Sequence, residues 1–180
     1  VGHAQVIDMN THCETLTECL QQVVEWSDQN PRHAPIWISF NLKDQPITGL
    51  PDPEKFTPES LLALDAQLRK LLGERLITPA QVQGLRWPTL ESARGKLLLI
   101  LDEGGAKRDW YYQDWRDRPM FTNAPEGHPA AAVMIINNPI KDFARIQRLV
   151  KAGYLVRTRA DANTLQARSN DTSQRDRAFA

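Results

Sequence analysis

Four apolar runs decide the fold of this chain: IWISFNLKD (residues 36–44), KLLLILDE (96–103), AAVMIINN (131–138) and YLVRTRAD (154–161). Continuous apolar runs of this length, separated by helical segments, are typical of parallel strands that are buried on both faces. Ligands bind at the carboxyl ends of the strands in such sheets and barrels. The runs therefore predict a site made of the polar residues that end them: Asn41, Lys43, Asp44, Asp102, Asn137, Asn138, Arg157, Arg159 and Asp161.

Helical signals lie between these runs. Apolar residues at the spacing of one helical face predict a helix from about 15 to 29, and Thr57 with Pro58 predicts the start of a second that stops at Gly73. Asp142 is the expected N-cap of a third helix that ends at Gly153. Residues 104–130, rich in aromatic residues, Gly and Pro, predict a long loop packed onto the domain.

The alternation of strand and helix predicts the α/β class, either a doubly wound sheet or a TIM-barrel-like parallel barrel. Residues 1–8 read as the tail of a further strand, which makes five predicted strands. A TIM barrel has eight strands and is usually about 250 residues long. We therefore expect a single domain over residues 1–180 that forms an incomplete barrel, without its first strands and its last one.

Composition excludes some classes of function. The chain has 22 basic and 22 acidic residues and a formal net charge of zero, so it lacks the one-sided positive field of a general nucleic-acid binder. Its longest apolar stretches, LLLIL and AAAVMII, are far shorter than the roughly 20 residues that span a bilayer. We expect no nucleic-acid partner and no transmembrane segment.

Several side chains are candidates for chemistry. His3 lies near the end of the first predicted strand, where its imidazole is either a general acid or base or an incidental histidine. Arg157, Arg159 and Asp161 share one face of their predicted strand. Two buried guanidinium groups need anions, so they either hold a substrate phosphate or form an ion-pair network with Asp102 or Asp161.

Two further features leave alternatives open. Cys13 and Cys19 are six positions apart, and they form either a disulfide that closes a small ring or a free pair in the core. Asn41 and Lys43 share a face at another strand end. An amide oxygen suits Ca²⁺, but one amide and scattered carboxylates do not define a calcium site.

A set of motifs resembles the calcium-dependent phosphatidylinositol-specific phospholipase C family of bacteria and fungi. In chain order, the motifs are H-x4-D-x3-H-C-x5-CL from residue 3, EWSDxxPxHxPI at 25–36, KD at 43–44, WPTLxxARGKLLxxLD at 87–102, NNP at 137–139 and GYLVRTRADANT at 153–164. The resemblance covers nearly the whole chain. It implies a TIM-barrel phosphodiesterase that is secreted or periplasmic, a disulfide between Cys13 and Cys19, and possible peripheral contact with membranes.

The resemblance also implies a mechanism. Two histidines act as base and acid, while Ca²⁺ activates the inositol 2-hydroxyl, whose attack on the phosphodiester gives diacylglycerol and a cyclic inositol phosphate. His3 corresponds to the second histidine, which protonates the leaving oxygen. Arg157 or Arg159 would bind phosphate or inositol hydroxyls, and Lys43 would assist.

The chain departs from the family pattern in two places. The first histidine and an acidic calcium-binding pair of the family are expected upstream of Val1. Asn41 stands where a further acidic ligand is expected, which removes a negative charge from the metal site and weakens calcium binding. Two alternatives follow: a non-catalytic barrel that binds a phosphorylated polyol or lipid head group, and a hydrolase that resembles glycerophosphodiester phosphodiesterases.

Overall fold

The structure, a computed structural model, describes residues 11–180. Its α-helices are α1 (Leu16–Gln29), α2 (Pro58–Leu72), α3 (Leu90–Ala93), α4 (Gly105–Tyr112), α5 (Phe143–Lys151), α6 (Leu165–Ser169) and α7 (Ser173–Phe179). Its strands are β1 (Ile36–Phe40), β2 (Leu76–Ile77), β3 (Leu97–Leu101), β4 (Phe121–Thr122), β5 (Val133–Ile135) and β6 (Leu155–Arg157). Short 3-10 helices occupy Gly73–Arg75, Pro79–Gln81, Gln83–Leu85 and Trp115–Asp117.

Strand β3 is the centre of the first sheet. It pairs in parallel with β1 along its whole length, from Ile36 opposite Leu97 to Phe40 opposite Leu101. Strand β2 pairs with the first residues of β3, and β4 pairs with the last ones, also in parallel. Because a strand has only two edges, β2 and β4 share the edge of β3 opposite β1. All five side chains of β3 are buried, as the continuous apolar run predicts.

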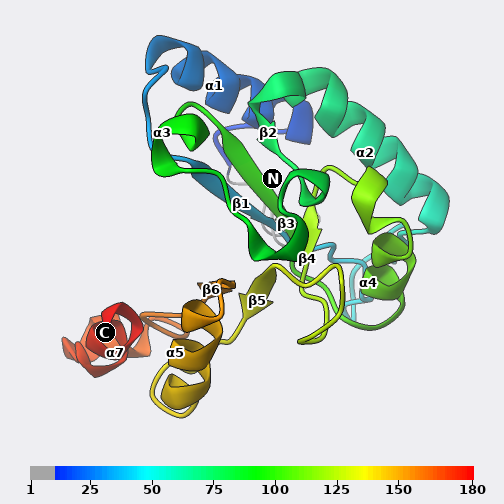
Figure 1. The fold of residues 1–180 in the computed structure, drawn as a ribbon. Helices are drawn as coiled ribbons and strands as arrows, with labels where there is room; N and C mark the ends of the chain where they lie inside the picture. Colours follow the sequence, from blue (N-terminus) through cyan, green and yellow to red (C-terminus); the bar gives the residue numbers. More distant parts are fainter. Residues whose placement is uncertain (1–10) are drawn as a thin grey trace.

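The two faces of β3 pack against different partners. Leu97, Leu99 and Leu101 join the core cluster that includes residues of α1, α2 and α4. Leu98 and Ile100 face the other way and join a cluster that includes Val133 of β5. Figure 1 shows α1 and α2 on one side of β1 and β3, with β5, β6 and α5 in a separate part of the molecule. The second cluster links that part to the first sheet.

The predicted helix starts are confirmed. Thr15 caps α1, and its hydroxyl accepts a hydrogen bond from the Glu18 amide while the Glu18 carboxylate accepts one from the Thr15 amide. Thr57 caps α2 with Ser60 in the reciprocal role. The disulfide between Cys13 and Cys19 is also present, with its Cα atoms 5.2 Å apart.

The prediction of a loop over residues 104–130 is wrong in two places. Helix α4 and strand β4 lie within it. Tyr111 is the buried residue of α4, so the helix lacks the repeated apolar face that would identify it in the sequence. Strand β4 is too short for any pattern to reveal. The expectation that the aromatic residues pack onto the domain is confirmed, since Tyr111 and Trp115 are both buried.

A buried polar network fixes α4 against α2. The Tyr111 hydroxyl donates a hydrogen bond to the Asp65 carboxylate at 2.6 Å, and Arg118 donates to the other oxygen at 2.9 Å. Burial raises the pKa of Asp65, whereas the hydrogen bonds from Tyr111 and Arg118 lower it. Desolvation and the adjacent carboxylate raise the pKa of Tyr111. The network holds α4 in the position from which Lys107 reaches the strand ends.

Strands β5 and β6 form a second, two-stranded parallel sheet, in which Ile135 lies opposite Arg157. Helix α5 connects them and buries Leu149 in a cluster with Met134 and Ile136. The sequence predicts these two strands and the helix between them, which together form a βαβ unit. The expectation of a parallel α/β fold is therefore confirmed, but residues 11–180 form two separate parallel sheets and no closed barrel.

The strands are shorter than the apolar runs that predict them. Strand β1 ends at Phe40 and β6 ends at Arg157, so the final polar residues of each run continue as irregular chain.

No helix in residues 11–180 is long and apolar enough to cross a bilayer.

Candidate functional site at the carboxyl ends of the strands

Three polar side chains follow one another around the carboxyl end of the first sheet. Ser39 of β1 lies opposite Ile100 of β3, and Ile100 lies opposite Phe121 of β4. Side chains alternate between the two faces of a strand, so the residue two positions after each of these shares its face. Asn41, Asp102 and Asn123 occupy those positions. The sheet register therefore brings one residue from each of three strand ends to the same layer.

These residues line a pocket of about 320 Å³. The rest of its wall consists of residues that directly follow β1 and β3 or belong to α4: Leu42, Lys43, Gln45, Glu103, Gly104 and Lys107. Most of these side chains are polar or charged. The pocket thus suits a small polar ligand rather than an apolar one.

Asn41 links the ends of β1 and β3. Its amide nitrogen donates a hydrogen bond to the backbone carbonyl of Asp102, and the backbone amide of Asp102 donates to the carbonyl of Phe40 at 2.9 Å. The next amide, of Leu42, donates to the Glu103 carboxylate. The side chain of Asn41 is therefore oriented by the neighbouring strand, with its carbonyl oxygen as its remaining polar atom.

Arg157 connects the second sheet to this pocket. Its guanidinium donates to the Asn137 side-chain oxygen at 2.5 Å and lies 3.9 Å from the Asp102 carboxylate. The side chains of Arg157 and Asp102 are 30% and 22% exposed, so neither charge is fully removed from water. Asn123 makes a second connection, because its side-chain oxygen accepts a hydrogen bond from the Ile135 amide at 3.2 Å. The carboxyl ends of both sheets converge here, as the sequence predicts.

Asp44 and Lys107 hold the chain that follows β1. The Lys107 ammonium donates to the Asp44 carboxylate at 2.6 Å and to the carbonyl of Leu42 at 2.5 Å. The other carboxylate oxygen of Asp44 accepts a hydrogen bond from the Phe56 amide at 3.0 Å. The hydrogen bond from Lys107, together with that from Phe56, lowers the pKa of Asp44 despite its burial. Asp44 is therefore a structural anion beneath the pocket.

The pocket wall carries charges of both signs, with Lys43 and Lys107 beside Asp102 and Glu103. Lys107 is neutralised by Asp44, and Arg157 lies near Asp102. Lys43 is exposed at the rim and has no carboxylate partner within residues 11–180. Amide groups of Asn41 and Asn123 complete the polar wall. Cations and amide groups of this kind bind phosphate oxygens.

Three predicted site residues have other structural roles. Asp161 accepts hydrogen bonds from the amides of Gln166 and Ala167, which begin α6. Arg159 is exposed, and its carbonyl accepts a hydrogen bond from Gln174. Asn138 accepts one from the amide of Lys141. Because β6 ends at Arg157, the alternation that would place Arg159 and Asp161 on the face of Arg157 does not continue. His3 lies outside the described residues.

Sequence reasoning missed six of the nine residues of the pocket wall, among them Glu103, Lys107 and Asn123. Glu103 directly follows Asp102 in the run KLLLILDE, so its position at a strand end was a usable signal. Lys107 and Asn123 belong to the segment that we interpreted as a loop, and they reach the pocket only because α4 and β4 form there.

The described residues do not fit a calcium site on their own. Calcium takes six to eight oxygen ligands and binds more tightly as carboxylates are added. No group of three or more His, Cys, Asp or Glu side chains in residues 11–180 is arranged to hold a metal ion. Asp102 faces Arg157, Glu103 accepts a hydrogen bond from Leu42, and Asn41 contributes a neutral oxygen. The pocket wall combines two lysines and two amides with two carboxylates, which are engaged by Arg157 and by the Leu42 amide.

Comparison with solved structures shows which proteins share the fold. The structure resembles a calcium-dependent phosphoinositol-specific phospholipase C from a Pseudomonas species, described as a myoinositol complex, with a TM-score of 0.61 and 18% sequence identity over 88% of this chain. It also resembles a Ca²⁺-dependent phosphatidylinositol-specific phospholipase C from Streptomyces antibioticus, with a TM-score of 0.59 and 18% identity over 79% of this chain.

The family follows from the sequence match. Residues 1–180 match the family described as phosphoinositide phospholipase C, Ca²⁺-dependent, and the chain belongs to that family. It spans 64% of the length of the Pseudomonas enzyme and 58% of that of the Streptomyces enzyme. A comparison with curated proteins found no match. The resemblance noted in the motifs is therefore confirmed at the level of the family.

Proposed function

We propose that the pocket at the carboxyl ends of β1, β3 and β4 binds the phosphate-bearing head group of a phosphatidylinositol-type lipid. We propose further that the protein carrying this chain cleaves the phosphodiester to diacylglycerol and a cyclic inositol phosphate. Family membership over residues 1–180 supports the reaction. The observation that carries the proposal is the convergence of Asn41, Asp102 and Asn123 on one polar pocket, with Arg157 of the second sheet beside Asp102.

The residues have distinct roles in this proposal. Lys43, exposed at the rim, meets the incoming phosphate. Arg157 lies 3.9 Å from Asp102, too far for a direct hydrogen bond, so a bound phosphate competes with that carboxylate for the guanidinium. The side chains of Asn41 and Asn123 form hydrogen bonds with the inositol hydroxyl groups, each of which can donate and accept a hydrogen bond. His3 remains the proposed acid for the leaving oxygen, on the strength of the motif alone.

The test is incubation of the full-length protein with phosphatidylinositol vesicles, with and without a calcium chelator, and detection of the cyclic phosphate by ³¹P NMR. We expect cyclic product, and we expect Arg157→Met to lower its rate by on the order of 10- to 100-fold, since a charge-assisted hydrogen bond is worth about 1.5–3 kcal/mol. Arg32→Met is the matched control, because Arg32 is 76% exposed and pairs with Glu91 on another surface. Equal rates in both variants would contradict the role of Arg157.

A second candidate is a barrel that binds the head group without cleaving it. The observation that favours it is the donor set around Asn41, which holds an amide where the family pattern has a carboxylate. Asn41→Glu separates the two candidates. If a metal requirement limits the reaction, this variant raises both calcium affinity, measured by calorimetry, and turnover; a pure binding protein gains calcium affinity without product.

We also propose that the protein meets its substrate at an anionic membrane surface outside the cytoplasm. Residues 139–180 contain nine basic and four acidic residues, a net charge of +5, whereas residues 1–138 carry 13 basic and 18 acidic residues, a net charge of −5. Ile140 and Leu165, 52% and 62% exposed, lie in the segments that follow the carboxyl ends of β5 and β6. Apolar side chains set among cations support contact with anionic lipid. The disulfide supports an oxidising compartment.

A further inference from the structure

A second cavity lies at the opposite end of the second sheet. Its volume is about 350 Å³, within the usual range of small-molecule sites, and its wall includes Trp115, His128 and Tyr154. His128 precedes β5 and Tyr154 precedes β6, so this cavity opens at the amino ends of these strands. It shares no residue with the pocket at the carboxyl ends. Nothing in the proposed phosphodiester chemistry uses it.

The wall of this cavity carries a stacked cation. The guanidinium of Arg116 lies 4.5 Å from the centre of the Trp115 ring, which is itself almost fully buried. Arg116 forms no ion pair with any carboxylate of residues 11–180, including its neighbours Asp114 and Asp117. Stacking fixes the plane of the guanidinium and leaves its N–H groups available to an anion.

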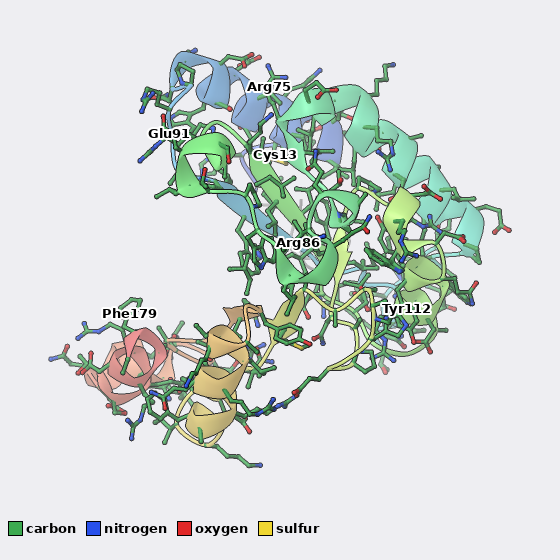
Figure 2. The ribbon with its side chains drawn as sticks, viewed as in Figure 1. Cys13, Arg75, Arg86, Glu91, Tyr112 and Phe179 are labelled. Atoms are coloured by element: carbon green, nitrogen blue, oxygen red, sulfur yellow. A yellow bond between two sulfur atoms is a disulfide. The ribbon has the colours of Figure 1, made fainter. Side chains whose placement is uncertain are left out.

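Two more donors line the cavity. The backbone amide of Ala130 donates to Nδ1 of His128 at 3.1 Å, which places the proton of the neutral ring on Nε2. The Tyr154 hydroxyl accepts a hydrogen bond from the Gly127 amide at 3.4 Å, so its own proton is available to donate. No Asp or Glu lines the cavity. The His128 ring also contacts Tyr112, labelled in Figure 2, with centroids 4.6 Å apart, which holds the imidazole in place.

Leu85 stands at the rim in a backbone conformation that is rare for its residue type, with φ of 59°. Gly153 permits this packing, because a Cβ there would lie 3.3 Å from the Cβ of Leu85. The Trp87 indole donates to the carbonyl of Gly153 at 2.8 Å and ties the same two segments together. A strained residue held by its surroundings is a frequent sign of a binding site.

We propose that this cavity binds a small planar organic anion, such as an aryl phosphate or an aromatic carboxylate. Arg116, His128 and Tyr154 supply three donors and no acceptor of comparable strength, and the partly exposed rings of His128 and Tyr154 supply an aromatic surface. The cavity is a second site, at the amino ends of β5 and β6, and it does not depend on the proposed function.

The test is a residue-resolved NMR titration of the full chain with phenyl phosphate and with benzoate at millimolar concentrations. We expect saturable shifts of the His128 ring and the Trp115 indole resonances with both anions, and none with benzyl alcohol, which lacks the charge. Arg116→Ala should weaken the binding by tenfold or more, since charge-assisted hydrogen bonds to an anion are lost.

Two controls make the outcome decisive. Arg86→Ala removes an exposed guanidinium that lines a different hollow, and it should leave the affinity unchanged. Lys43→Ala alters the carboxyl-end pocket and should also leave the shifts of His128 in place. Absence of saturable shifts at His128 and Trp115 in a folded wild-type chain overturns the proposal. Equal binding by the Arg116→Ala and Arg86→Ala variants overturns it as well.

Discussion

Replacing Lys107 by methionine tests how the pocket is held. Lys107 donates to both Leu42 and Asp44, and its side chain is 15% exposed against 5% for Asp44. Breaking a fully buried ion pair costs about 3–5 kcal/mol, and an exposed one about 0–1 kcal/mol. Asp44 keeps the Phe56 amide as a donor, which reduces the cost. We therefore expect Lys107→Met to lower the free energy of unfolding by about 2–3 kcal/mol.

Urea denaturation followed by circular dichroism measures this change. With a denaturant slope of about 2 kcal/mol/M, the midpoint should fall by about 1–1.5 M. Lys70→Met is the matched control, because Lys70 is exposed on α2 and makes no ion pair within residues 11–180; its effect should stay within about 0.5 kcal/mol. Asp44→Asn in the Lys107→Met background should cost less than in the wild type. Equal midpoints for Lys107→Met and Lys70→Met would refute the reasoning.

Three other predictions concern stability. Asp65→Ala leaves Arg118 and the Tyr111 hydroxyl buried without their acceptor. It should lower the free energy of unfolding, measured by urea denaturation, by about 3–5 kcal/mol. A loss below about 1 kcal/mol would contradict a buried network. The hydrogen bond from Lys107 lowers the pKa of Asp44 in the folded state. The ionised Asp44 therefore stabilises the fold above pH 3.8, its ordinary pKa, and this stabilisation is lost as the pH falls through the pKa of the folded state. The free energy of unfolding of Asp44→Asn, measured as the pH is lowered, should lack this loss. Reduction of the disulfide, whose cysteines are 6 positions apart in the sequence, should lower the free energy of unfolding by about 2 kcal/mol. An unchanged melting temperature under reducing conditions would contradict this prediction.

The parts of the fold that the sequence predicts are those set by local chemistry. Thr15 and Thr57 begin their helices because their hydroxyl groups satisfy free backbone amides, and such caps are visible as residue types. Strand β3 is predictable because all five of its side chains are apolar. The polar residues at the ends of β1 and β3 converge because parallel pairing aligns those ends, a consequence of topology alone.

The parts that the sequence misses depend on distant contacts. Helix α4 is fixed by Tyr111, whose partner Asp65 lies 46 positions away, and no local period reveals that pairing. Arg159 lies beyond the end of β6 at Arg157 and is separated from the pocket. A run of residues with strand character does not reveal where strand pairing stops, so the sequence does not predict this separation. Closure of a barrel is a property of how sheets meet. A list of strands therefore predicts the class but not the closure.

The most direct test of the account is an NMR titration of the full chain with a soluble inositol phosphate, followed at the side-chain amides of Asn41 and Asn123. The account predicts saturable shifts of both amides, weaker binding at higher salt, and loss of most of the affinity in Arg157→Met. Unshifted amides of Asn41 and Asn123 in the folded chain, at concentrations that saturate other phosphate-binding proteins, would contradict the assignment of this pocket to a phosphate-bearing head group.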